Sequence, residues 1–305
     1  MTQTRYRGRF APSPTGPLHF GSLVTALASY LQARTNAGAW LLRIDDLDQT
    51  RMVAGMDSLI LQTLEVFGFE WDEQVSYQSQ TVSAYQNALQ QLQEKGLTYA
   101  CQCTRSQIKA TARTGLEGPV YPDTCRELGL PDTGSRAIRL RTDDSPIAFD
   151  DGIYGRQQQR LHQDIGDFVI RRADGYFAYQ LAVVVDDHLA GITDILRGAD
   201  LLASTARQIH LQRLLGYQEP RYLHVPLVLD EAGRKLSKSD KAFPVDINNP
   251  TKSLLAAWQF LNQPAPPSDF GLSLPAFWQW ATTHWHPGLV TPQAGQIDER
   301  IPNTL

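Results

Sequence analysis

The segment RFAPSPTGPLHFGS, residues 9–22, decides the fold of this chain. A strand predicted at residues 6–10 runs into a loop rich in Pro and Gly, and from His19 the apolar residues take up helical spacing. A helix that starts directly after such a loop presents unpaired N–H groups and a partial positive charge, which bind an anion. Gly21 lets a nucleotide approach the backbone, and His19 is placed to stabilise negative charge on a phosphate. Taken alone, the segment is equally typical of an ordinary loop before an ordinary helix.

Strands and helices alternate along the rest of the chain. Apolar patterns predict strands at 40–44, 194–197 and 223–229, and helices at about 53–67, 82–95 and 204–215. Gly38 stands where a cap for the first helix belongs. The alternation predicts an α/β fold with a Rossmann-like, parallel-sheet core that binds a nucleotide.

The middle of the chain differs in composition. Residues 101–135 are rich in Gly, Pro and Thr, contain every cysteine and show little periodicity. We therefore expect an inserted α+β subdomain at 98–175, between the two parts of a catalytic domain at 1–97 and 176–240. Residues 241–305 predict a short helical C-terminal domain. Its aromatic residues between 277 and 286 are expected to pack that domain, with stacking on RNA bases as the alternative.

The composition is that of a folded, soluble protein. Of 305 residues, 42% are hydrophobic and 20% are charged. No apolar run has the length of a membrane span and no signal-peptide pattern opens the chain, so we expect a cytoplasmic protein. A net charge of −4 argues against broad coating of nucleic acid, but it is compatible with a local basic surface.

A second phosphate motif, KLSKS, occupies residues 235–239. Lys235 and Lys238 share a polar loop with Ser237 and Ser239. A mobile cationic loop of this kind clamps a triphosphate and neutralises the departing pyrophosphate. Without further context, two lysines at this spacing are also typical of a solvated basic loop.

The three cysteines are Cys101, Cys103 and Cys125. An odd number in a cytoplasmic chain is a poor basis for disulfides. Thiolates bind Zn²⁺ with tetrahedral geometry. The residues alone leave two interpretations open, a zinc site with one further ligand or a group of buried free thiols.

The two phosphate motifs, at opposite ends of an α/β core, resemble the paired signatures of class I aminoacyl-tRNA synthetases. In detail, the motifs resemble those of glutamyl-tRNA synthetases. The similarity extends over residues 5–240 and is carried by residues 9–19, LRIDD at 42–46, VVDDH at 184–188, GIT at 191–193 and RGAD at 197–200. The resemblance implies an enzyme that makes glutamyl-adenylate from L-glutamate and ATP with Mg²⁺.

The resemblance also assigns roles to single residues. The catalytic residues would be His19, Lys235 and Lys238, and ATP would contact these together with Ala11, Gly16, Gly21 and Ser237. Glutamate would bind to Arg9, Ser13, Asp45, Tyr179 and Arg197. The two arginines would hold its side-chain carboxylate, because a guanidinium offers only donors. Asp45, which stands where the family usually has Glu, would meet its ammonium group.

A short branch of the glutamyl family carries a C-x-C…Y-x₃-C pattern as a zinc site. By that resemblance Cys101, Cys103, Tyr121 and Cys125 hold one structural Zn²⁺ that staples the loop-rich insertion. Tyrosine is an unusual zinc ligand, so Asp123 or a water molecule remains an alternative.

Two other acidic groups suggest a metal at first sight. We expect Asp186 and Asp187 to end a buried helix and to order the neighbouring loops instead. For Asp45, Asp46 and Asp48 we expect contact with the substrate amine and structural pairing with Arg51 instead of Mg²⁺.

The short stretch after the lysine loop changes which molecule is expected to accept the glutamyl group. Glutamyl-tRNA synthetases continue well past this loop with helical domains that read the anticodon, whereas only residues 240–305 follow here. With the cysteine pattern, this resembles the glutamyl-Q tRNA(Asp) synthetase family, which implies transfer of glutamate to queuosine in the anticodon of tRNA(Asp). The expected partners are ATP, L-glutamate and that tRNA, with no membrane and no obligate protein partner. Two alternatives stay open: a conventional glutamyl- or glutaminyl-tRNA synthetase core that needs a partner, and a non-catalytic paralogue that binds nucleotide or tRNA.

Overall fold

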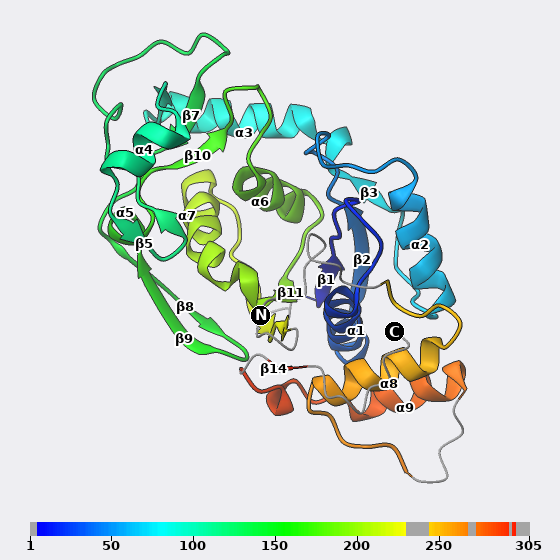
Figure 1. The fold of residues 1–305 in the computed structure, drawn as a ribbon. Coiled ribbons are helices and arrows are strands. Elements are labelled where there is room, and N and C mark those ends of the chain that lie inside the picture. The colour runs from blue at the N-terminus through cyan, green and yellow to red at the C-terminus, as the bar shows by residue number, and fades with distance from the viewer. Residues whose placement is uncertain (1–4, 230–243, 268–272, 293–294, 297–305) are drawn as a thin grey trace.

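A computed structural model describes residues 5–229, 244–267, 273–292 and 295–296. At its centre lie parallel strands (Figure 1). β1 (Arg7–Phe10) pairs with β2 (Ala39–Ile44), and the short β3 (Ser76–Tyr77) pairs with the far edge of β2. β11 (Asp194–Gly198) and β12 (Arg221–Val225) form a second parallel pair. The amide of Thr193 donates to the carbonyl of Arg7 at 2.9 Å, which holds β11 alongside β1. The predicted α/β fold with a parallel sheet is confirmed.

Helices cover these strands on both sides. They are α1 (Phe20–Thr35), α2 (Met56–Val66), α3 (Val82–Glu94), α6 (Tyr179–Leu189) and α7 (Thr205–Leu215), with 3₁₀ turns η1 (Gln78–Gln80) and η2 (Ala199–Ser204). One apolar cluster surrounds α1, which buries Leu23, Leu27 and Leu31. A second cluster lies among α3, α6 and α7. α3 buries Tyr85, Ala88, Leu89 and Leu92, the single apolar face that its spacing predicts.

The end of α1 differs from the prediction. The helix ends at Thr35 with Asn36 as its C-cap, and Ala37 adopts a positive φ of 48°. A Cβ atom on Gly38 would lie 2.5 Å from the carbonyl oxygen of Tyr6. Gly38 is therefore required by close backbone packing against the segment before β1, and not by a left-handed helix cap.

Between α3 and α6 the chain forms small β structures around two short helices. β4 (Thr98–Cys101), β7 (Ala137–Leu140) and β10 (Phe168–Arg171) make an antiparallel sheet in the order β10-β7-β4. The remaining elements are α4 (Arg105–Thr111), β5 (Thr114–Gly115), β6 (Gly118–Pro119), β8 (Pro146–Asp151), β9 (Gly155–Arg160) and α5 (Leu161–Asp164).

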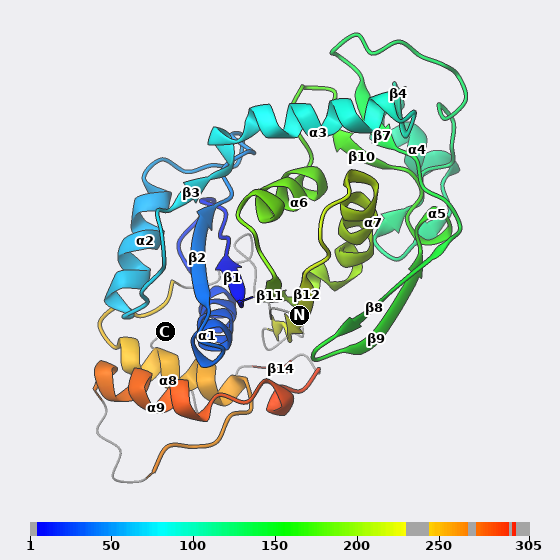
Figure 2. The same ribbon diagram turned by 180° about the vertical axis from the view of Figure 1, so that it is seen from behind.

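The β8–β9 hairpin joins the core sheet, which the sequence did not predict. Asp151 at the end of β8 pairs with Tyr222 of β12, and the amide of Gly152 donates to the Tyr222 carbonyl at 2.9 Å. The strand order is β11-β12-β8-β9. Both views show the hairpin on the opposite side of the molecule from α2 (Figures 1 and 2).

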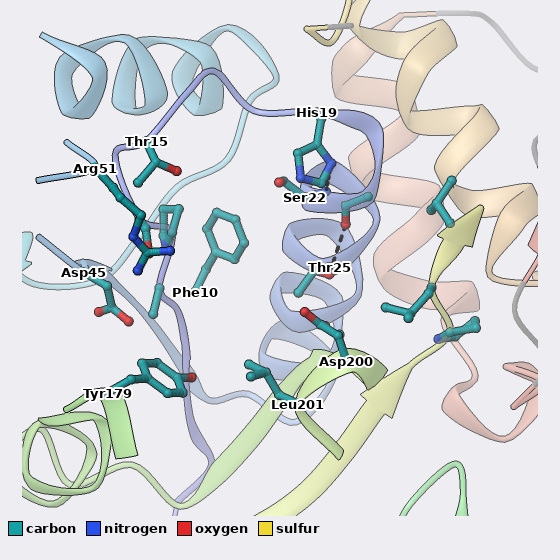
Figure 3. A pocket seen from close by; sticks show the side chains of 18 residues that line it. Phe10, Thr15, His19, Ser22, Thr25, Asp45, Arg51, Tyr179, Asp200 and Leu201 are labelled. Carbon is teal, nitrogen blue, oxygen red and sulfur yellow. Dashed lines mark hydrogen bonds between the residues drawn. The ribbon is translucent and has the colours of Figure 1, made fainter. Parts of the chain in front are cut away.

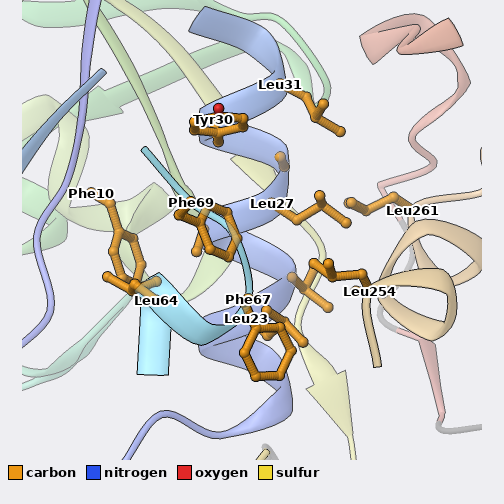
Figure 4. Packing of buried hydrophobic residues seen from close by; sticks show 14 of the residues in the cluster. Phe10, Leu23, Leu27, Tyr30, Leu31, Leu64, Phe67, Phe69, Leu254 and Leu261 are labelled. Carbon is orange, nitrogen blue, oxygen red and sulfur yellow. The ribbon is translucent and has the colours of Figure 1, made fainter. Parts of the chain in front are cut away.

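The C-terminal helices pack against α1. α8 (Pro250–Phe260) and α9 (Leu274–His284) are followed by the 3₁₀ turn η3 (Pro287–Leu289), and β13 (Val228–Leu229) pairs in parallel with β14 (Gly295–Gln296). Figure 4 shows Leu254 and Leu261 beside Leu27 of α1. The Trp278 ring lies 4.8 Å from the Tyr30 ring, so this aromatic residue packs the domain as expected. In the described part of the chain, no helix has both the length and the apolarity to cross a membrane.

Candidate active site

A cavity of about 500 Å³ opens at the carboxyl ends of the parallel strands (Figure 3). Its walls are the loop after β1, the start of α1, the acidic turn after β2, the start of α6 and the segments after β11 and β12. This edge of an α/β sheet is where such folds bind nucleotides and other ligands. The predicted site residues that line the cavity are Ala11, Ser13, His19, Gly21, Asp45 and Tyr179.

His19 caps the N-terminus of α1. Its Nδ1 accepts a hydrogen bond from the Ser22 amide at 3.2 Å. The neutral ring therefore carries its proton on Nε2, as a donor that suits a phosphate oxygen. A Cβ atom on Gly21 would lie 3.2 Å from both Cε1 and Nδ1 of His19. Gly21 thus keeps space for the imidazole as well as lining the cavity.

Of the predicted ATP contacts that do not line the cavity, the structure describes only Gly16. Gly16 is buried in the loop between β1 and α1 and is not part of the cavity wall. Lys235, Ser237 and Lys238 lie outside the described residues.

A buried network of charges lies next to the cavity. Arg43 donates from Nε to Asp45 at 2.7 Å and from Nη1 to Asp187 at 2.7 Å. Asp187 also accepts two hydrogen bonds from Arg9, at 3.0 and 3.1 Å. Asp45, which faces the cavity, is thereby connected to Arg9 through Arg43 and Asp187.

The carboxylates of this network differ in acidity. Burial raises the pKa of Asp45 to about 6. The charge and the hydrogen bond of Arg43 lower this pKa, but they offset the effect of burial only in part. Burial acts in the same direction on Asp187, but the guanidinium groups of Arg9 and Arg43 outweigh it and lower the pKa of Asp187. Of these two carboxylates, Asp45 is the one whose burial is less compensated by positive charge, and it is also the one that reaches the cavity.

Arg197, at the end of β11, is buried among uncharged partners. It donates to His224 Nε2 at 3.0 Å, to Gln208 Oε1 at 2.7 Å and to Thr205 Oγ1 at 2.9 Å. Its residue exposure is 4%, and no carboxylate in the described ranges forms an ion pair with it. Nη2 also donates to the Leu201 carbonyl at 3.3 Å, so these contacts use four of the five guanidinium N–H donors.

Arg9 and Arg197 do not line the cavity themselves, whereas Tyr179 does. Burial of the Tyr179 hydroxyl raises its pKa, and the positive charges of Arg197 and Arg9 act on it in the opposite direction. Both predicted arginines therefore act electrostatically on the Tyr179 hydroxyl, although neither lines the cavity.

The acidic groups that suggested a metal are occupied by protein donors. Asp186 accepts hydrogen bonds from Gln78, Thr81 and Tyr85 at 2.7–2.8 Å. Arg51 donates to Asp48 at 2.7 Å. These contacts agree with a structural role for Asp186 and Asp48.

The cysteines converge as a separate cluster in the β4 region. The sulfurs of Cys101, Cys103 and Cys125 lie within 4.8 Å of one another. The Tyr121 hydroxyl lies 3.4 Å from the Cys101 sulfur and 3.7 Å from the Cys103 sulfur, and it accepts the Cys125 amide at 2.8 Å. Asp123 belongs instead to a group with His162 and Asp167. Burial raises the pKa of the Cys103 thiol to about 11.

A smaller cavity of about 260 Å³ adjoins the first one. The two share Ser13, Thr15, Asp45, Arg51 and Tyr179. The wall that belongs only to the smaller cavity includes Arg172, Tyr176 and Phe177. This second wall combines a cation with aromatic rings.

Sequence reasoning missed several of these residues. Arg43 carried one signal, because a charge inside an otherwise apolar strand needs a buried partner. His224, Gln208 and Asp151 carried none that a linear pattern reveals, since their contacts depend on strand register and on the β8–β9 hairpin.

The fold and the cavity define a class I tRNA synthetase catalytic domain. Residues 5–262 match the family described as tRNA synthetases class I (E and Q), catalytic domain. A glutamate tRNA ligase from Elizabethkingia meningosepticum, solved in complex with its amino acid, has a TM-score of 0.79 and 26% identity, covering 97% of this chain and 68% of that one.

Proteins with similar sequences indicate a more specific family. The glutamyl-Q tRNA(Asp) synthetase of Chromobacterium violaceum is 52% identical over 286 residues, which cover 93% of this chain and 95% of that protein. That of Pseudomonas entomophila is 47% identical, covering 96% and 97%. The chain belongs to the glutamyl-Q tRNA(Asp) synthetase family and is a class I aminoacyl-tRNA synthetase-like ligase, with activity of the glutamate–tRNA ligase type.

Proposed function

We propose that this protein activates L-glutamate with MgATP and transfers the glutamyl group to queuosine in the anticodon of tRNA(Asp). The observation that carries the proposal is the buried Arg197, which has neutral partners and lies beside a cavity lined by Asp45 and Tyr179. A buried cation that forms no ion pair with the described part of the chain favours a ligand that supplies a negative charge. The names of the relatives support the choice of acceptor.

Glutamate matches the charges around the cavity. Arg197 and Arg9 would attract its side-chain carboxylate, with the Tyr179 hydroxyl between them and the ligand. Because guanidinium groups only donate, glutamine would bring its own amide N–H groups against donors and bind weakly. Asp45 would accept the ammonium group.

His19 lies at the other end of the cavity from Asp45 and Tyr179, as Figure 3 shows. This separation supports a linear arrangement of amino acid and nucleotide phosphates. The α-carboxylate oxygen attacks the α-phosphorus and pyrophosphate leaves. We propose that His19 Nε2–H and the α1 N-terminus stabilise charge on the phosphates, together with Lys235, Ser237 and Lys238. Ala11 and Gly21 would contact the nucleotide, and so would Gly16 through its loop.

The second half-reaction needs an acceptor next to the adenylate. A hydroxyl of the cyclopentene ring of queuosine would attack the glutamyl carbonyl, lose its proton, and release AMP as the ester forms. We propose that the base enters through the smaller adjoining cavity, since Tyr176 offers a ring for stacking and the partly exposed Arg172, which also pairs with Asp174, offers a charge for a phosphate.

The cysteine cluster fits one structural Zn²⁺. With Zn–S bonds of about 2.3 Å, tetrahedral geometry separates two sulfurs by roughly 3.8 Å and a sulfur from an oxygen by roughly 3.5 Å. The Cys103 and Cys125 sulfurs are 3.4 Å apart, and the Tyr121 hydroxyl lies at 3.4 and 3.7 Å from two sulfurs. We propose Cys101, Cys103, Cys125 and Tyr121 as the ligands, in preference to Asp123.

We also propose the division into a catalytic domain of residues 1–97 and 176–240, an inserted subdomain of 98–175, and a C-terminal domain of 241–305. The antiparallel β10-β7-β4 sheet supports a separate insertion. The β8–β9 hairpin, which pairs with β12, belongs structurally to both parts.

One experiment tests the function. The protein is incubated with ATP, labelled glutamate and tRNA from cells with or without queuosine, and pyrophosphate exchange is measured in parallel with glutamate and glutamine. We expect exchange with glutamate, and labelling of tRNA(Asp) only when queuosine is present. Labelling independent of queuosine would favour the conventional synthetase core. Absence of exchange would favour the non-catalytic paralogue.

A further inference from the structure

A buried chain of three side chains ends at Arg197. Asp151 stands at the end of β8. Its Oδ2 atom lies 2.6 Å from Nδ1 of His224, and both side chains are fully buried. The other ring nitrogen of His224, Nε2, lies 3.0 Å from Nε of Arg197. The register that pairs β11 with β12 sets Arg197 beside His224.

The contacts determine which His224 nitrogen carries the proton. Arg197 Nε can only donate, so His224 Nε2 must accept. Nδ1 therefore carries the hydrogen and donates it to the Asp151 carboxylate. Burial, reinforced by the charge of Arg197, lowers the pKa of His224 to about 4 although Asp151 opposes this, so the ring is neutral at physiological pH. A protonated Nε2 would face the Arg197 N–H donor to donor.

Asp151 cannot be replaced by its amide without changing this arrangement. Its Oδ1 accepts the amides of Ile153 at 3.0 Å and Tyr154 at 2.9 Å. An asparagine must keep its oxygen on those two amides, which turns its NH₂ group toward His224. The imidazole would then move its proton to Nε2 and lose the hydrogen bond to Arg197.

We infer that Asp151 and His224 are positioning residues that hold the Arg197 guanidinium in the orientation that receives the side-chain carboxylate of the amino-acid substrate. The inference rests on the proposed function, in which that substrate is glutamate. A second anchor acts from the other side, because Gln208 accepts from Arg197 Nη1 at 2.7 Å and donates to Gln180 at 2.9 Å. Arg197 is thus oriented by uncharged acceptors, and its charge remains available for a substrate carboxylate.

Two substitutions at one position separate positioning from simple structural support. In His224→Gln the side-chain oxygen can reach the position of Nε2 and accept from Arg197. In His224→Asn the amide N–H can replace the Nδ1 donor to Asp151, but no side-chain atom replaces Nε2 as the acceptor of Arg197 Nε. Both variants lose one buried hydrogen bond, so a purely structural role predicts equal effects.

The experiment measures the KM for glutamate, the KM for ATP and the exchange rate by pyrophosphate exchange. We expect His224→Asn and Asp151→Asn to raise the glutamate KM by about 10- to 100-fold, with the ATP KM changed by less than about threefold, and His224→Gln to stay within about fivefold of wild type. The control is Asp150→Asn, whose exposed carboxylate pairs with Arg156. Equal glutamate KM values for the two His224 variants would overturn the inference.

A measurement on the unsubstituted protein covers the case in which the variants do not fold. Nitrogen-15 NMR of the histidine rings should show His224 with its proton on Nδ1, and a proton on Nε2 would overturn the inference. Absence of glutamate-dependent exchange in the wild-type enzyme would instead count against the proposed function, and the tautomer could still be read.

Discussion

Arg9 and Asp187 form a two-point ion pair, with Nε 3.0 Å from Oδ1 and Nη2 3.1 Å from Oδ2, and each side chain is only 5% exposed. Asp187 also accepts from Arg43 at 2.7 Å. One carboxylate therefore bridges two buried guanidinium groups from neighbouring strands, and Arg43 is paired with Asp45 as well.

Asp187→Ala should destabilise the protein by about 3–5 kcal/mol, because it leaves both arginines buried with less compensation. Chemical denaturation measures the loss. Glu219→Ala is the matched control, since its ion pair with Arg213 is well exposed and should contribute at most about 1 kcal/mol. A loss for Asp187→Ala no greater than for the control would contradict this account of the core.

Glutamate activation should weaken in mild acid. Burial raises the pKa of Asp45 to about 6, so below that pH the neutral carboxyl predominates and no longer attracts an ammonium group. We expect kcat/KM for glutamate to fall by about tenfold per pH unit below pH 6, beyond any fall seen for ATP. Asp45→Asn should lower kcat/KM at neutral pH and abolish this part of the profile. A profile unchanged in Asp45→Asn would exclude Asp45 as its cause.

Gly21→Ala should impair the chemical step. The new Cβ would lie 3.2 Å from the His19 ring and displace it by a few tenths of an ångström. We expect kcat for pyrophosphate exchange to fall by about tenfold with little change in the glutamate KM. Gly288→Ala, where an added Cβ meets nothing within 4 Å, is the control. Equal kcat values for the two variants would argue that the ring position does not matter.

Lys238→Ala should slow adenylate formation by roughly 10²-fold or more, if Lys238 stabilises charge on the leaving pyrophosphate. Lys241→Ala, a change of the same chemistry three residues further along, is the control. Unchanged exchange kinetics for Lys238→Ala would remove this lysine from the mechanism.

Purified protein should contain one zinc ion per chain by elemental analysis. Cys125→Ser should lose it, and Tyr121→Phe should bind it more weakly because one ligand oxygen is gone. Asp123→Asn should retain full occupancy, since Asp123 lies with His162 and Asp167 rather than with the sulfurs. Metal-free wild-type protein would refute the site. If Asp123→Asn lost zinc and Tyr121→Phe kept it, Asp123 would replace Tyr121 as the fourth ligand.

The sequence predicts those parts of the fold that depend on local pattern. The strand, loop and helix at residues 6–35 follow from the apolar spacing and from the loop rich in Pro and Gly, and the structure has all three. The β8–β9 hairpin was missed because β9 reads GRQQQR, where no apolar face indicates a strand. The hairpin is fixed by its pairing to β12, a contact between residues far apart in the chain.

The same distinction holds for the site. Motifs led to His19 and Asp45, which line the cavity. The partners of Arg197 were not predicted, because His224 reaches it through strand register and Asp151 through the hairpin. A side chain that orients a ligand-binding residue without touching the ligand is rarely part of a linear motif.

The attachment of β8 to β12 also constrains how related enzymes can be recombined. A chimera that exchanges residues 98–175 for the insertion of another synthetase would also exchange Asp151, and with it the acceptor of the His224 proton. Such a graft could keep every recognised motif and still misorient Arg197. To preserve these contacts, the exchanged segments should end before Pro146 and resume after Arg160. The β8–β9 hairpin then comes from the same protein as the catalytic domain.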